Sequence, residues 1–208
     1  MLTDLYSNVH LLLRWIHVLA GIIWIGHLYF FTFVNVPFQG TIGPDVKKVV
    51  NPQMLGRALW WFRWGAMITL VAGLALFTQL YMYTPGVGFG PSAMFSTADG
   101  MSGRSVWILI GMAFGFTMWF NVWFVIWPAQ RKILPAVRDG TAVDPALARK
   151  VLRTSRANAY MSGPLLFGML APSHYGAISV VGAALAIGLG LLAIWWAIRV
   201  SPTVGTSV

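Results

Sequence analysis

Apolar residues run along this chain in five long stretches, separated by polar and basic segments. An α-helix needs about 20 mainly apolar residues to cross the hydrocarbon core of a bilayer, and each stretch has about 18 to 29. The stretches are apolar all round, whereas barrel strands alternate in segments of about ten residues, so helices are favoured. The most polar stretch is the fourth. The predicted spans are about 9–36, 58–83, 105–128, 154–171 and 176–199.

Composition agrees with a membrane protein. The 208 residues are 58% hydrophobic and 9% charged, with a mean hydropathy of +0.72. A soluble domain has about 25% charged residues. The sequence therefore predicts an all-α fold, an integral membrane helical bundle with five transmembrane helices in one membrane domain over residues 1–208. No signal-peptide pattern precedes the first span, which we expect to be retained.

Basic residues mark one side of the predicted bundle. They gather in the segments 37–57 and 129–153 and at Arg199, while 84–104 and 172–175 carry almost none. The positive-inside rule then places the N-terminus outside and the C-terminus in the cytoplasm, in the inner (cytoplasmic) membrane. This distribution explains the net charge of +9 through the lipid bilayer, without a nucleic-acid partner.

Three local patterns add expectations about the loops and about packing. The segment 84–104 is rich in Gly, Ser and Pro and is expected to be irregular. The segment 135–150 predicts a turn followed by a short surface helix, with Asp144 near its start. Gly182, Ala186 and Gly190 form a small-residue stripe, which indicates packing within the bundle or, as an alternative, a dimer interface.

The chemistry-bearing residues of the first span share one face. His10, Arg14, His17, Gly21 and Trp24 are spaced by 4, 3, 4 and 3 residues, which places them on one narrow helical stripe. Ionisable groups inside a membrane span are costly and indicate a function. The absence of cysteine excludes disulfides, thiolate metal sites and covalently attached c-type haem.

His174, between the last two spans, is expected at the same outer level as His17. Neutral imidazoles from two helices can hold a b-type haem, so we predict haem b with His17 and His174 as its metal ligands. Gly21 would let the macrocycle approach the helix, and Arg14 would pair with a propionate. His10 is an alternative ligand or a propionate partner. Copper is the second candidate metal, since imidazole and thioether both suit it.

A second polar set is predicted in the cytoplasmic half of the bundle. Arg63, Asn121, Arg156 and Asn158 could together bind an anion or a quinone headgroup. Alternatively, the two arginines extend toward lipid phosphates. His27 lies off the stripe of the first span and is interpreted as a hydrogen-bonded packing residue.

Four segments of the chain resemble a known family. RWIHVLAGIIWIGHLYFFTFVNVPF, ALWWFRWGAMIT, FNVWFVIWPAQRKIL and TSRANAYMSGPLLFGMLAPSHY, in this order, resemble the membrane domain of the urate hydroxylase family, the N-terminal region of a membrane urate oxidase. The resemblance covers roughly residues 10–176. The first helix, with six residues between His17 and Trp24, is also similar to haem-binding membrane protoporphyrinogen oxidases and to copper-resistance membrane proteins.

The resemblance implies redox chemistry. Long members of the family continue into a cytochrome c domain with a Cys-x-x-Cys-His haem site, and this chain has no cysteine. A separate redox partner protein, or a larger membrane complex, would then exchange electrons with it. A urate-like substrate would need a cationic pocket, for which Arg63 and Arg156 are the candidates.

Three functions follow from these patterns. The first is a membrane b-type haem protein or subunit in electron transfer, with a quinone or an external cytochrome as partner. The second is a urate hydroxylase-like oxidoreductase that acts with a separate electron acceptor. The third is a non-enzymatic structural subunit of a larger membrane complex. A transporter is disfavoured, because no predicted span contains an acidic residue to carry protons or sodium.

Overall fold

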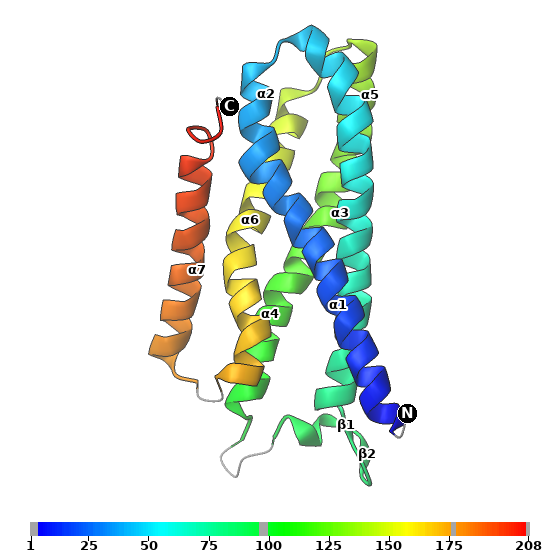
Figure 1. Cartoon of the computed structure of the whole chain (residues 1–208), viewed down its shortest axis with the longest axis vertical. Helices are drawn as coiled ribbons and strands as arrows, with labels where there is room; N and C mark the ends of the chain where they lie inside the picture. Colours follow the sequence, from blue (N-terminus) through cyan, green and yellow to red (C-terminus); the bar gives the residue numbers. More distant parts are fainter. Residues whose placement is uncertain (1–3, 96–99, 176–177, 207–208) are drawn as a thin grey trace.

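The computed structural model describes residues 4–95, 100–175 and 178–206, and long helices dominate it (Figure 1). The first helical rod and the third each contain a π-helical segment. A small hairpin and a 3₁₀ turn follow the second rod. The elements in chain order are α1 Leu5–Tyr29, η1 Phe30–Asn35, α2 Val36–Thr41, α3 Pro44–Tyr81, β1 Tyr83–Thr84, β2 Gly88–Phe89, η2 Pro91–Ala93, α4 Gly103–Phe120, η3 Asn121–Ile126, α5 Trp127–Asp139, α6 Pro145–His174 and α7 Val180–Val200.

Among the described residues, four helical rods are long and apolar enough to cross a membrane. They are Leu5–Thr41, Pro44–Tyr81, Gly103–Asp139 and Val180–Val200. The expected helical bundle is therefore confirmed, and the four rods indicate a membrane protein. The remaining predicted span lies in α6, which has 30 residues but carries several basic side chains in its first half.

The helices extend well beyond the predicted spans. The segment 37–57, predicted as a loop, is instead the end of the first rod, a short turn at Ile42 and Gly43, and the start of α3. Pro44 suits the first turn of a helix, where its missing N–H group costs nothing. With 38 residues α3 is about 57 Å long, so it projects beyond a hydrocarbon core of about 30 Å.

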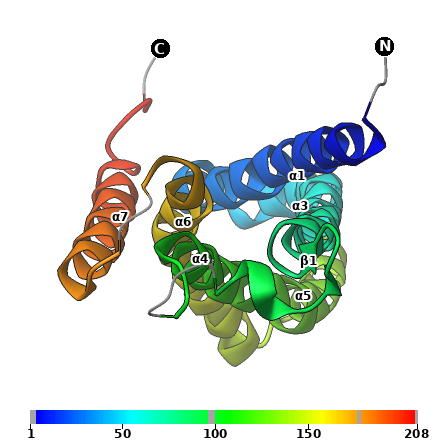
Figure 2. The ribbon, with the colours of Figure 1, turned by 90° about the horizontal axis from the view of Figure 1, so that it is seen from below.

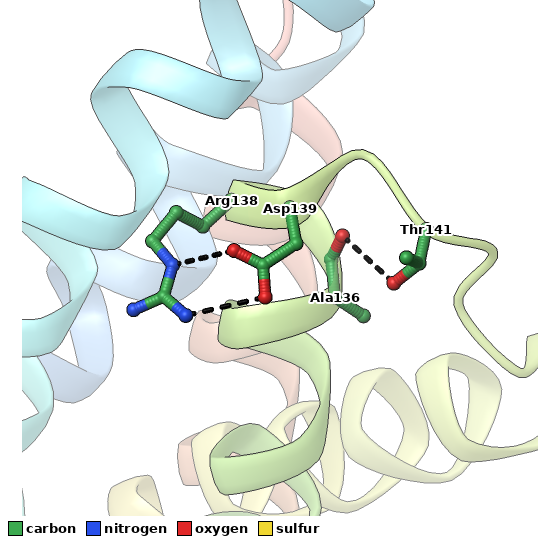
Figure 3. A network of polar contacts seen from close by, with 4 residues as sticks. All are labelled: Ala136, Arg138, Asp139 and Thr141. Atoms are coloured by element: carbon green, nitrogen blue, oxygen red, sulfur yellow. Dashed lines mark hydrogen bonds and ion pairs between the residues drawn. The ribbon is translucent and has the colours of Figure 1, made fainter.

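The turn between α5 and α6 is well defined (Figure 3). Gly140 ends α5 in the left-handed conformation with φ of 69°, and Thr141 Oγ1 donates to the Ala136 carbonyl at 3.3 Å. The Asp144 side chain accepts the Ala146 N–H at 2.8 Å and caps α6. Asp144 thus begins a helix as predicted. The helix is not the short surface helix expected, because it continues without a break to His174.

The segment after α3 is more ordered than the sequence indicated. β1 and β2 pair antiparallel, with Tyr83 opposite Phe89 and Thr84 opposite Gly88. Gly86 and Gly88 have φ of 82° and 103°, which side-chain-bearing residues rarely adopt. Residues 96–99 of the predicted loop lie outside the described part of the chain.

Glycines set the closest helix contacts. A Cβ atom on Gly163 of α6 would lie 2.5 Å from the Gly190 carbonyl oxygen of α7, and one on Gly111 of α4 would lie 3.0 Å from the backbone of Gly168. Gly190 belongs to the predicted small-residue stripe, and Ala186 of that stripe is only 8% exposed. Packing within the bundle is thereby confirmed as the role of these two residues.

The ends of the bundle differ in charge. One end of the bundle holds the N-terminus, the hairpin, the end of α6 and the start of α7 (Figure 1). The other end holds the α2–α3 and α5–α6 turns and the C-terminus. The second end is the basic end. It carries Lys47, Lys48, Arg131, Lys132, Arg138, Arg149, Lys150, Arg153 and Arg199. The predicted grouping of the basic segments thus agrees with their positions in the fold.

Candidate functional site

His17 is held between α1 and α3. Its Nδ1 lies 2.9 Å from the Thr69 carbonyl oxygen, and a Cβ atom on Gly73 would lie 2.8 Å from its Cε1. A carbonyl can only accept, so Nδ1 carries the proton and Nε2 keeps its lone pair. Within the described residues Nε2 makes no hydrogen bond. Metal-ligating histidines are commonly oriented in this way, with the second ring nitrogen bonded to a carbonyl.

Gly21 and Trp24, two further residues of the predicted stripe, face α3. A Cβ atom on Gly65 would lie 3.1 Å from the Trp24 backbone nitrogen, and Trp24 is only 3% exposed. A Cβ atom on Gly21 would lie 4.0 Å from Thr69 Cγ2. The common face of these residues is therefore real, and its main structural effect is to pack α1 against α3. Beside Gly21, the neighbouring space is partly filled by Thr69.

His10 and Arg14 form a pair on the outer turns of α1. Arg14 Nη2 donates to His10 Nε2 at 3.2 Å, so Nε2 of His10 is already engaged and Nδ1 carries its proton. Arg14 is exposed and His10 is partly exposed. On the same helix, Arg14 is three residues and His10 seven residues before His17. The pair lies where the sequence predicts a contact with a haem propionate.

His174 lies at the same level as His17 but on a different part of the bundle. Tyr29 Oη of α1 lies 2.9 Å from Ser162 Oγ of α6, and each histidine is 12 residues, about 18 Å, from that contact along its own helix. The two helices diverge toward that end (Figures 1 and 2), and His174 is exposed at the end of α6. The shared level matches the prediction, but the structure does not bring the two rings together.

The donor set at His17 is that of a single axial imidazole. Among the described residues, no three or more His, Cys, Asp or Glu side chains gather where a metal ion could be held. A multidentate copper site is thus not formed by these side chains alone. For haem, the oriented His17 ring with its unpartnered Nε2 would supply one imidazole ligand, and among the described residues no second histidine lies beside it.

The two predicted asparagines form one buried contact. Asn121 Nδ2 donates to Asn158 Oδ1 at 2.8 Å, and Asn158 Nδ2 donates to the Met118 carbonyl at 3.0 Å. Asn158 is fully buried. Asn121 is the first residue of η3. Short π-helical segments inside α-helices are frequently found at functional sites. In this structure the pair joins η3 to α6 in the core.

The two predicted arginines lie in different surroundings. The Arg63 guanidinium carbon lies 3.8 Å from the centre of the Trp127 ring, within cation–π range, and Trp123 Nε1 donates to the Arg63 carbonyl at 3.1 Å. Arg156 is exposed and lines a cavity of about 210 Å³ with Asn35, Gln130 and other residues. Arg63 and the asparagine pair do not line that cavity.

The largest cavity described lies between α1 and α3 and was not predicted from the sequence. Its volume is about 900 Å³, within the range of small-molecule sites. Sequence reasoning missed it because His27 was interpreted as packing and Arg57 was placed in a loop. The lining residues are Ile22, Ile23, Gly26, His27, Phe30, Val49, Val50, Gln53, Met54, Arg57, Ala58 and Trp61.

A comparison with known protein families tests the resemblance that the sequence motifs indicated. Residues 87–201, more than half of the chain, match the family model described as "Urate oxidase N-terminal". The chain belongs to the urate oxidase N-terminal family. It matches none of the curated proteins and none of the solved structures with which it was compared.

The segment that matches the family model runs from the hairpin to the end of α7. It contains Asn121, Arg156, Asn158 and His174. The residues of α1 and α3, including His17 and the large cavity, precede it. The expected similarity of the first helix to haem and copper membrane proteins stays a prediction.

Proposed function

We propose that this urate oxidase N-terminal protein is the membrane part of an oxidoreductase and passes electrons through a b-type haem on His17. One observation carries the proposal: the Thr69 carbonyl fixes the His17 tautomer and leaves Nε2 without a partner. A haem bound there would supply one-electron transfer. The chain's own contribution is to orient the imidazole through Thr69 and to keep its ring close to α3 at Gly73.

The outer rim supports the same site. The Arg14 guanidinium, exposed and bonded to His10, retains free N–H groups that suit a propionate. Arg14 lies toward the end of the bundle with few basic residues, and we propose that an external cytochrome would exchange electrons with the haem at that end. His174 lies at the same level and would serve as second ligand only if α1 and α6 approached each other at that end.

An absorption spectrum with iron analysis tests the haem. Purified protein should show a Soret band and stoichiometric iron, and His17→Gly should lose both, with the band restored by added imidazole. His27→Gly is the matched control, since that ring is on the same helix and bonds to its own Ile23 carbonyl. A colourless, iron-free preparation, or a His17→Gly variant with an unchanged spectrum, refutes the haem proposal.

Urate-like substrates form a second candidate, favoured by the family match over residues 87–201. A small planar anion would need a cationic site, and the structure offers Arg156 at the smaller cavity and Arg57 at the larger one. Urate consumption with an artificial electron acceptor, measured in wild-type and Arg156→Leu protein, tests this. Urate left unchanged while the redox centre is reduced and reoxidised would rule it out.

We also propose that α6 spans the membrane as a fifth helix, with the basic end of the bundle in the cytoplasm, in the inner membrane. Support comes from the 30-residue length of α6 and from the basic residues at one end. The chain has no native cysteine, so Ser7→Cys and Ser201→Cys report the two ends cleanly. A membrane-impermeant thiol reagent on intact cells should label the first variant and spare the second.

A further inference from the structure

The cavity between α1 and α3 is open to the surroundings of the bundle. The residues that line it come only from α1, η1 and α3, so two helical rods form its walls and no third helix closes it. Trp61, at its edge, is 51% exposed. Both rods are apolar enough to cross a membrane, so in a bilayer the open side of the groove would face lipid. A ligand of this groove therefore arrives from the lipid phase.

His27 gives this apolar groove a hydrogen-bond acceptor. Its Nδ1 lies 2.7 Å from the Ile23 carbonyl oxygen, so Nδ1 carries the proton and Nε2 has a free lone pair. Among the described residues Nε2 has no hydrogen-bond partner. A polar atom in the apolar part of a span is costly unless a partner satisfies it. His27 is thus matched to a ligand that donates a hydrogen bond.

Arg57 gives the same groove a donor nearer the basic end. Its Nη1 donates to the Gln53 carbonyl at 3.0 Å, and its other N–H groups make no hydrogen bond within the described residues. Because α1 and α3 are antiparallel and meet at Trp24 and Gly65, the helical rise places the backbone of Arg57 about 7–8 Å beyond that of His27 along the bundle. The Gln53 contact holds the guanidinium on the side toward the basic end, so Arg57 has to leave that carbonyl to meet a ligand held at His27.

We propose that this groove binds a lipid-soluble para-hydroquinone, with one hydroxyl donating to His27 Nε2 and the opposite oxygen accepting from Arg57. Its apolar ring and tail suit the Ile, Val and Phe side chains of the groove. A phospholipid phosphate would pair with Arg57 but would leave the His27 acceptor without a donor. The inference rests on the proposed function, because a hydroquinone would serve a redox protein as an electron donor. Binding of the hydroquinone itself requires no haem.

Ligand binding by the full chain in lipid nanodiscs tests the site. The probes are radiolabelled decylubiquinol, kept reduced, and decylubiquinone. His27→Leu should weaken quinol binding about 3- to 10-fold, the equivalent of one lost hydrogen bond. It should also remove the preference for quinol over quinone, which has no hydroxyl to donate.

A second variant separates binding from folding. A Cβ atom on Gly26 meets nothing within 4 Å and faces the groove, so Gly26→Phe should fill it and lower quinol affinity at least 10-fold. Gly188→Phe adds the same bulk to an exposed site on α7 where nothing lies within 4 Å. This control should bind quinol like the wild type.

Two binding results would overturn the quinol site. Quinol affinity unchanged in both His27→Leu and Gly26→Phe refutes the site. Loss in Gly26→Phe with none in His27→Leu, together with displacement of quinol by added phosphatidylglycerol, identifies a lipid groove instead. Since the readout is binding, a protein that lacks a Soret band but shows the expected losses refutes the haem on His17 and leaves the quinol site standing.

Discussion

The contact between α6 and α7 gives a prediction whose sign can be worked from the structure. A Cβ atom on Gly163 would lie 2.5 Å from the Gly190 oxygen, 2.7 Å from its carbonyl carbon and 2.9 Å from its Cα. All three atoms are backbone, so no side chain can rotate away. Ordinary contact begins near 3.4 Å, and Gly163→Ala therefore forces α7 outward by close to 1 Å.

The magnitude is a difference between two terms. Overpacking in a close helix contact costs about 1–3 kcal/mol. Replacing Gly by Ala inside a helix returns up to about 1 kcal/mol. The net expectation for Gly163→Ala is destabilisation by up to about 2 kcal/mol, which lowers Tm by up to roughly 8 °C for a chain of this size.

Gly188→Ala is the matched control. Gly188 lies on α7 and a Cβ atom there meets nothing within 4 Å, so the substitution keeps the propensity gain without the clash. Thermal unfolding in one detergent, followed by intrinsic fluorescence, should place the control at or above the wild type and Gly163→Ala below it. Equal Tm values for the two variants would show that α7 does not pack on Gly163 as described.

Three further outcomes follow from polar contacts. Asn158→Leu should destabilise the protein by about 1–3 kcal/mol in detergent unfolding, because it removes a fully buried amide and leaves the partly buried Asn121 amide without its acceptor. An unaltered midpoint would contradict that contact. Arg138→Ala should leave the unfolding midpoint close to that of the wild type, since its ion pair with Asp139 is exposed and screened by water; a clear fall in the midpoint would contradict this. The pKa of the Asp4 carboxyl is lowered mainly by a hydrogen bond from the Ser7 hydroxyl, so its capping of α1 is complete above the ordinary pKa of 3.8 and is lost as the pH falls through the lowered value. The protection factors of the first amides of α1, which correct for the intrinsic pH dependence of exchange, should fall only at acid pH, and Asp4→Asn should remove that fall.

The two proposed sites share one helix. His17 and His27 are ten residues apart on α1, about 15 Å along its axis. Each ring donates through Nδ1 to a carbonyl, but the carbonyl belongs to α3 for His17 and to the same helix for His27. His17 is therefore fixed by the packing of two helices, whereas His27 depends only on its own turn. This difference makes His17 the more rigid ring of the two.

Much of the architecture could be predicted from sequence because it depends on hydropathy and spacing alone. The helical class, the position of the apolar stretches and the grouping of basic segments at one end all follow from composition along the chain. The shared face of His17, Gly21 and Trp24 follows from a spacing that every α-helix imposes. These features need no knowledge of which helix lies beside which.

Other features depend on tertiary contacts and left no local signal. The hydropathy of a sequence marks only the part of a helix that lies in lipid, whereas the helix itself continues as long as its backbone hydrogen bonds are made. For this reason α3 begins at Pro44, and Arg57 lies on a helix and not in a loop. Which side of the bundle a helix occupies is set by packing between glycines such as Gly163 and Gly190. For this reason sequence placed His17 and His174 at one level, but only the fold decided that α1 and α6 diverge there and that His27 opens onto a groove.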